Sequence, residues 1–273
     1  MRMRFRKCAF ACYLTLPLSF LLANSLLSAQ SMLVKASAKT NSSPISSSLE
    51  RQFKRDAARI SLRIDSEKEE VRYLPVAISR DQLNGIYKAL VNIYSNDESA
   101  KSIARCNIHT FPNPSIDHLT IIYKRTAEWA APLRQGVSET TNKDFNRLLD
   151  QYELAIEKHV QWNDTQDAVT LRSKEPLNMA ALAASFENIP GVIQIDLGLP
   201  KFGGNDVKAK RIGGGWEIDF ILQINSGGSL KQHVWKYRAL DSGQVSFVQE
   251  VGEPIPSWMK CQNGDFNTLS YRF

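Results

Sequence analysis

Cysteine and histidine are scarce in this chain of 273 residues, which contains four of each. A tetrahedral metal site needs a set of closely spaced cysteine, histidine or carboxylate ligands. His109 and His118 lack that tight spacing, and no second pair of cysteine or histidine ligands completes a tetrahedron with them. The sequence therefore predicts neither a metal site nor a bound cofactor.

Catalytic and nucleotide-binding motifs are missing as well. The glycine-rich segment Asn225–Ser229 lacks the lysine and the helix that directly follow the glycines of a phosphate-binding P-loop. We interpret it as a plain polar turn. No other segment carries a recognisable catalytic pattern, so we assign no catalytic residue to the chain.

Basic charge is concentrated at the N-terminus. The formal net charge of the chain is +6, but residues 1–38 hold five cations and no acidic residue, which leaves +1 for the remainder. A nucleic-acid-binding domain presents a basic patch or stripe, so we expect no nucleic acid as partner. The five cations are Arg2, Arg4, Arg6, Lys7 and Lys35.

The same N-terminal residues predict an export signal. A basic head precedes an apolar body from Ala9 to Leu27 and then a run of small residues, the three parts of a secretory signal peptide. Cleavage follows either Ala29 or the sequence Ala36-Ser37-Ala38. The alternative is an uncleaved anchor, for which the apolar body is barely long enough, since a membrane span needs about 20 apolar residues.

Export places the protein in the periplasm or outside the cell, with membrane contact only through the signal segment during export. Cys8 and Cys12 lie within the signal and no cysteine sits directly after a cleavage site, which argues against a lipid anchor. Cys106 and Cys261 then remain, and an oxidising destination favours a disulfide between them. Two buried free thiols are the alternative, because sequence cannot show that the two residues are close.

The clearest structural pattern is a β-meander between Lys208 and Glu250. Turns at Gly213-Gly214 and at Asp241-Ser242-Gly243 separate segments in which apolar and polar residues alternate. A type I′ turn at Gly213-Gly214 opposes Lys210 to Glu217 and Lys208 to Asp219. The predicted core face carries Val207, Ala209, Trp216, Ile218, Phe220, Trp235, Tyr237, Ala239, Val245 and Phe247.

Helices are predicted before the meander. Capping boxes at Ser47 and Ser79 open two amphipathic helices, and a short helix is expected over Ala127–Leu133. The stripe of Phe145, Leu148, Leu149, Tyr152, Ile156 and Val160 predicts a long helix over Asn142–Gln161, with His159 as a hydrogen-bonded, half-buried residue at its edge. Pro176 is expected to begin a further helix. The predicted strands are Leu119–Tyr123, Val169–Leu171 and Val192–Leu197, the last of which feeds the meander.

The nearest approach to a chemical cluster is Cys106, His109, Asp117 and His118. We considered a metal site and a cysteine–histidine nucleophile there, and favour structural loop residues, because an exported thiol tends to be oxidised.

The C-terminal half resembles a group of uncharacterised exported bacterial proteins. The similarity spans roughly residues 176–260 and rests on an Ile-Pro-Gly-Val turn, a strand led by Trp216, a His-x-Trp strand, a Gly-x-Val turn and a closing Pro-x-Trp sequence. It implies a bacterial exported protein and no particular activity. The polar loop Asn225–Ser229 stands where that group often has cysteines.

Together these patterns predict an α+β protein, with amphipathic helices packed on a mainly antiparallel C-terminal sheet. The expected organisation is a signal and cleavage region over 1–38, a disordered leader over 39–46, one domain over 47–261 and a frayed tail over 262–273. We favour an exported soluble binding or interaction module. The alternative is an envelope or extracellular hydrolase that uses carboxylates such as Asp196, Asp206, Glu217 or Asp219.

Overall fold

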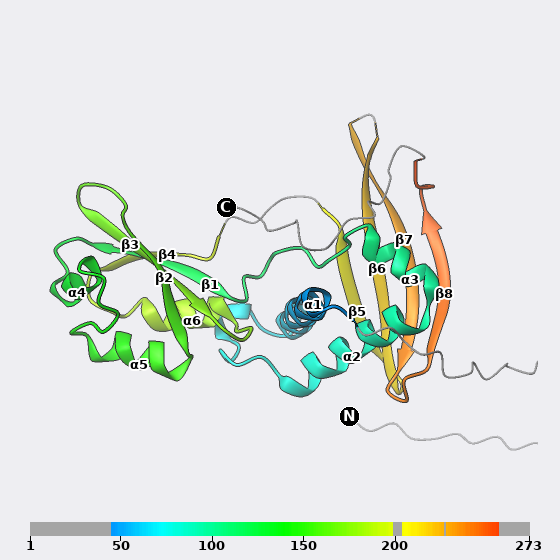
Figure 1. Ribbon diagram of the computed structural model, residues 1–273, viewed down its shortest axis with the longest axis horizontal. Coiled ribbons are helices and arrows are strands. Elements are labelled where there is room, and N and C mark those ends of the chain that lie inside the picture. Colours follow the sequence, from blue (N-terminus) through cyan, green and yellow to red (C-terminus); the bar gives the residue numbers. More distant parts are fainter. Residues whose placement is uncertain (1–44, 199–203, 227, 257–273) are drawn as a thin grey trace, which may run out of the picture. The chain divides into compact units, whose positions relative to one another are not determined.

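The computed structural model describes residues 45–198, 204–226 and 228–256 (Figure 1). Contacts divide the chain into Met1–Thr40 and Asn41–Phe273, and every described residue belongs to the second part. The predicted signal, most of the predicted leader and the predicted tail lie outside the described residues. None of the described helices is long and apolar enough to cross a membrane.

The α+β class is confirmed by two antiparallel four-stranded sheets accompanied by helices. The helices are α1 (Ser47–Ser66), η1 (Val71–Tyr73), α2 (Arg80–Asn96), α3 (Glu98–Arg105), η2 (Glu128–Ala130), α4 (Ala131–Arg134), α5 (Lys143–Gln151) and α6 (Met179–Phe186). The strands are β1 (His118–Lys124), β2 (Leu154–Gln161), β3 (Gln166–Ser173), β4 (Val192–Asp196), β5 (Asp206–Ile212), β6 (Gly215–Ser226), β7 (Ser229–Leu240) and β8 (Val245–Gly252).

The predicted meander is the sheet with strand order β5-β6-β7-β8. Lys208 pairs with Asp219 and Lys210 with Glu217, as the sequence predicts. Of the two turn glycines only Gly214 has a positive φ, at +72°, so the type I′ assignment is wrong although the register is right. Phe247 lies against Tyr237 with ring centroids 5.3 Å apart, but it remains 46% exposed at the sheet edge.

Helices α1 and α2 cover the core face of this sheet. Helix α1 begins directly after a serine cap, where the Ser46 hydroxyl accepts the N–H of Leu49, so the cap lies one residue before the predicted Ser47. A glycine in the middle of α2 has a packing reason. A Cβ at Gly85 would lie 3.0 Å from the indole nitrogen of Trp216, which is 5% exposed. Gly85 therefore lets α2 approach the sheet closely.

The lysines of the first hairpin do not form the ion pairs that their register suggests. Glu217 lies 3.4 Å from the Lys236 ammonium and 3.6 Å from the Arg238 guanidinium, both on β7. Lys236 also lies 3.3 Å from Asp219. Among the described residues, no ion pair involves the two β5 lysines, so these cations remain exposed beside carboxylates that β7 neutralises.

The second sheet has the order β2-β3-β1-β4. Strands β1, β3 and β4 correspond to the three strands predicted before the meander, whereas β2 was not predicted. Strand β4 pairs antiparallel with β1, so the prediction that the Val192 strand feeds the meander is wrong. The core of this sheet is aromatic: Trp129 lies 5.1 Å from Tyr123 and 5.1 Å from Phe145, and Phe145 lies 5.5 Å from Phe186, measured between ring centroids. Each sheet therefore has its own apolar core.

The predicted helix over Asn142–Gln161 is wrong in its second half. Helix α5 ends at Gln151, Glu153 takes a positive φ of 49°, and β2 then pairs with β3. His159 is hydrogen-bonded and half-buried as predicted, but from this strand, with its Nε2 atom 2.8 Å from the Tyr123 hydroxyl. The last helix begins at Met179, after an Asn178 cap, rather than at Pro176.

Candidate functional site

The cluster that the sequence singles out separates into two groups in the structure. His109 directs its Nδ1 atom to the Asp56 carboxylate at 2.8 Å, and Asp56 also accepts the N–H and the hydroxyl of Thr110 at 2.9 and 2.6 Å. Burial raises the pKa of Asp56, but the charge and hydrogen bonds from His109 and Thr110 outweigh burial and hold this pKa below 3.8. The contacts of Asp56 with His109 and Thr110 therefore hold the loop after α3 against helix α1.

Asp117 is the centre of the other group. Its carboxylate lies 2.6 Å from Arg55, 3.0 Å from the His118 Nδ1 atom and 3.6 Å from Arg172. Burial raises the pKa of Asp117, but the His118 hydrogen bond and the Arg55 charge overcome that effect and lower it to about 2. Asp117 thus connects α1, β1 and β3 through Arg55, His118 and Arg172. His118 therefore has a structural role.

Cys106 belongs to neither group. It is half-buried and packs against the core of the β5–β8 sheet. Cys261 lies outside the described residues, so a bond between the two remains a prediction. Across the part of the chain that the structure describes, no three His, Cys, Asp or Glu side chains are placed to hold a metal ion.

The four carboxylates considered for a hydrolase are not gathered in one site. Asp196 accepts the N–H of Gly198 at 2.9 Å. Asp206 is bound by Arg63, and Glu217 and Asp219 face the cations of β7. Each carboxylate therefore has a partner, and three of the four lie beside a cation.

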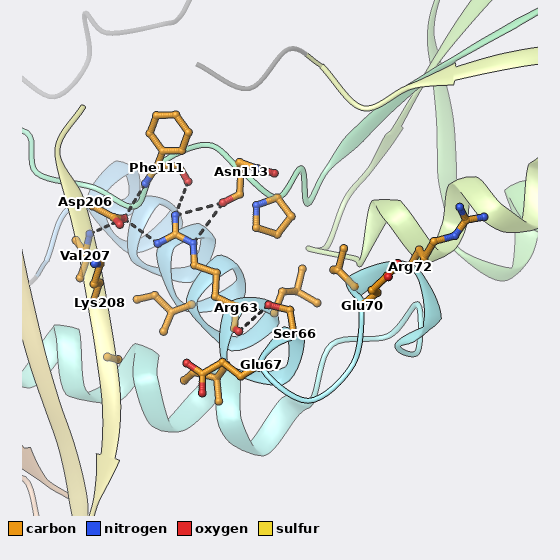
Figure 2. Close-up of a pocket in the computed structure, with 16 residues that line it drawn as sticks. Arg63, Ser66, Glu67, Glu70, Arg72, Phe111, Asn113, Asp206, Val207 and Lys208 are labelled. Atoms are coloured by element: carbon orange, nitrogen blue, oxygen red, sulfur yellow. Dashed lines mark hydrogen bonds and ion pairs between the residues drawn. The ribbon is translucent and has the colours of Figure 1, made fainter. Parts of the chain in front are cut away.

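The candidate site is a groove of about 820 Å³ between α1 and β5, which we call the α1–β5 groove (Figure 2). Its walls come from the C-terminal part of α1, the turn after that helix, the loop before β1 and the first half of β5. The apolar lining residues are Ile60, Leu62, Ile64, Val71, Phe111, Pro114, Val207 and Ala209. The polar lining residues are Arg63, Ser66, Glu67, Glu70, Arg72, Asn113, Asp206 and Lys208.

Arg63 holds one end of the α1–β5 groove together. Figure 2 shows its guanidinium directed at Asp206, 2.8 Å away, and at the carbonyl oxygens of Phe111 and Asn113, 3.0 and 3.2 Å away. Asp206 also accepts the N–H groups of Phe111 and Val207. Because Arg63 and Asp206 satisfy each other, neither offers an open charge to a ligand, and together they fix the distance between α1 and β5.

The remaining charges lie on opposite walls of the α1–β5 groove. Lys208 extends from β5, whereas Glu67 and Glu70 lie on the turn after α1, and all three residues are exposed. Arg72 is engaged with Glu187 at 3.2 Å. The groove therefore has apolar walls and two carboxylates on its α1 side, and Lys208 lies at its β5 rim with its side chain on the sheet face away from the core.

The groove is not predictable from the sequence, because its walls are distant in the chain. From the sequence, Asp206 is only a candidate hydrolase carboxylate and Lys208 only part of a paired strand face. One sequence pattern does indicate the basic face of α1 that contributes Arg63 to the groove. Arg55, Arg59 and Arg63 recur every four residues and so share one face of the helix. Arg59 is only 6% exposed, and burial followed by the Arg55 charge lowers its pKa.

Comparisons of the chain with protein-family models, curated proteins and solved structures found no match. Any inference about its function therefore rests on its own residues.

Proposed function

We propose that this protein is an exported, soluble binding module that holds an extended polypeptide segment of a partner in the α1–β5 groove. The observation that carries the proposal is the groove itself, which combines apolar walls with the outermost strand of a sheet. Ligand sites are concave and largely apolar with a few placed polar groups. Outermost strands can accept a further strand from a partner.

The hydrolase alternative has less support. General acid–base catalysis needs two groups within reach of one bond, with environments that set their protonation states. Asp206 lines the groove but is held by Arg63 at 2.8 Å. Glu67 and Glu70 are exposed to solvent and lie on the same wall of the groove.

Export is supported by the N-terminal pattern of basic residues, apolar body and small residues. Mass spectrometry of the mature protein is expected to place the new N-terminus between Ala29 and Lys39. Recovery of chains with an intact Met1 from membranes would contradict export with cleavage and support an anchor.

Binding is tested by panning a displayed library of random peptides against the chain purified after export. Peptides that bind in the groove must lose affinity for Ser66→Trp, because Ser66 is exposed and lines the groove. The matched control is Ser47→Trp, an exposed serine at the other end of α1. Enrichment of no peptide, or equal binding to both variants, would refute the proposal.

A further inference from the structure

Strand β5 has an open edge. It is the outer strand of the β5–β8 sheet, and within the described residues it pairs only with β6. In an antiparallel ladder that closes on a two-residue turn, the residues flanking the turn form a hydrogen-bonded pair, and such pairs alternate with non-hydrogen-bonded ones. Ile212 flanks the turn, so Lys210 and Lys208 bond to β6, while Val207, Ala209 and Arg211 direct their backbone groups outward.

One contact supports this assignment independently. The N–H of Val207 donates to the Asp206 carboxylate at 2.9 Å, as an outward-pointing group can. For Ala209 and Arg211, no backbone hydrogen bond to another segment is found within the described ranges. Their N–H and C=O groups are therefore available to a strand laid beside β5.

The two β5 lysines make this edge selective. Lys208 and Lys210 are exposed on the outer face, and the carboxylates opposite them are engaged by Lys236 and Arg238. Side chains directly opposite each other on neighbouring strands lie about 4.5–5.5 Å apart, and opposite charges there are stabilising. A strand added to β5 would therefore gain by placing acidic residues beside the lysines.

The other face of an added strand meets different chemistry. Its side chains would point to the side of the sheet that α1 covers, where the groove is lined by Ile60 and Ile64. Glu67 lies on that wall and would repel an acidic residue there. Apolar residues are favoured at those positions, because they bury surface against the α1 wall.

Resting on the proposed function, we infer that the partner segment is added as a strand to β5 and alternates acidic with apolar residues. The acidic side chains lie opposite Lys208 and Lys210, and the apolar ones enter the α1–β5 groove. Lysines on an outer strand also discourage pairing between identical edges. If the lysines only prevented such pairing, the edge would bind acidic and basic peptides equally. A preference for the acidic peptide therefore distinguishes the two roles.

The test compares three synthetic eight-residue peptides by fluorescence anisotropy: alternating glutamate and valine, alternating lysine and valine, and a block peptide with the glutamates together. We expect the alternating acidic peptide to bind at least about fivefold more tightly than either of the others. Lys208→Glu with Lys210→Glu should reverse the charge preference. The matched control, Lys158→Glu with Lys143→Glu, changes exposed lysines elsewhere and should leave it unchanged.

Backbone pairing is tested separately with N-methylated versions of the alternating peptide. Methylation on the edge that faces β5 should weaken binding by about tenfold or more, whereas methylation on the other edge should not. Equal effects of both methylations, or no response to the β5 charge reversal, would overturn the strand-addition inference. If peptides still lose affinity for Ser66→Trp in that case, the proposed function stands and only its strand geometry fails.

Discussion

Replacing Asp117 with asparagine should destabilise the protein in a way that depends on pH. The Asp117 carboxylate contacts Arg55, His118 and Arg172, and its side chain is 11% exposed. Asparagine keeps the size of the side chain but removes the charge that these contacts stabilise. The loss should therefore follow the ionisation of Asp117.

The magnitude follows from the pKa of Asp117, which falls from 3.8 to about 2 in the folded protein, since hydrogen bonding and cationic neighbours outweigh burial. A pKa that is lower in the folded state stabilises that state above the unfolded pKa, and the gain disappears as pH falls through the folded pKa. The difference corresponds to about 2 kcal/mol at pH 7, about 1 kcal/mol near pH 3 and nothing well below pH 2.

Urea denaturation of both proteins between about pH 3 and pH 7 measures the effect. The Asp117→Asn variant should lose about 2 kcal/mol at pH 7 and about half of that near pH 3. Asp144→Asn is the control, because the side chain of Asp144 is 76% exposed and forms an exposed ion pair with Arg147 one helical turn away. A loss at Asp117 that is the same at both pH values would refute the linkage.

Three further predictions follow from the packing and the cysteines. Trp216→Ala should lower the free energy of unfolding by about 3–5 kcal/mol in denaturant titration, because it empties a core position. Lys210→Ala on the exposed face should change it by less than about 0.5 kcal/mol. Similar losses for both variants would contradict the assigned faces. Gly85→Val should lower stability by about 1–3 kcal/mol, because its side chain would collide with the indole, and an unchanged midpoint would contradict that contact. Cys106 and Cys261 should show no titratable thiol in the denatured, unreduced mature protein, and their bridge should contribute at most about 5 kcal/mol; two reactive thiols would exclude the bridge.

The meander was predictable because local and cross-strand chemistry agree there. Glycine turns fix where the chain reverses, and the period of two fixes which face is buried. The opposed charges also gave the correct register, Lys210 with Glu217. Their ion pairs were not predictable, because the competing cation, Lys236, comes from a third strand. The sequence alone does not show how that strand aligns with β6.

In the other sheet, β1, β3 and β4 were predicted as strands, but β2 was missed because long-range pairing overrides a helical period there. Ile156 and Val160 continue the apolar stripe of α5, yet both lie in β2 and pair with β3. Their β-branched side chains suit a strand, and the positive φ at Glu153 separates the two elements. A period of 3.6 in the sequence cannot show that the backbone changes conformation partway along it.

The groove depends on contacts between residues far apart in the chain. Arg63 and Asp206 are 143 residues apart, and no spacing rule connects them. Helix α1 and strand β5, which carry these residues, were predictable from local patterns, but their juxtaposition was not. The candidate site therefore could not be predicted from the sequence, whereas strand β5 and its lysines Lys208 and Lys210 could.

Amide hydrogen exchange with the alternating glutamate–valine peptide tests the central claim most directly. If the partner segment adds to β5, the amides of Ala209 and Arg211 should become protected, because they gain hydrogen bonds at the open edge. The amides of β2, the outer strand of the other sheet, should exchange at unchanged rates. Protection confined to β2 or β8, or no protection at Ala209 and Arg211 under saturating peptide, would contradict binding at the α1–β5 groove.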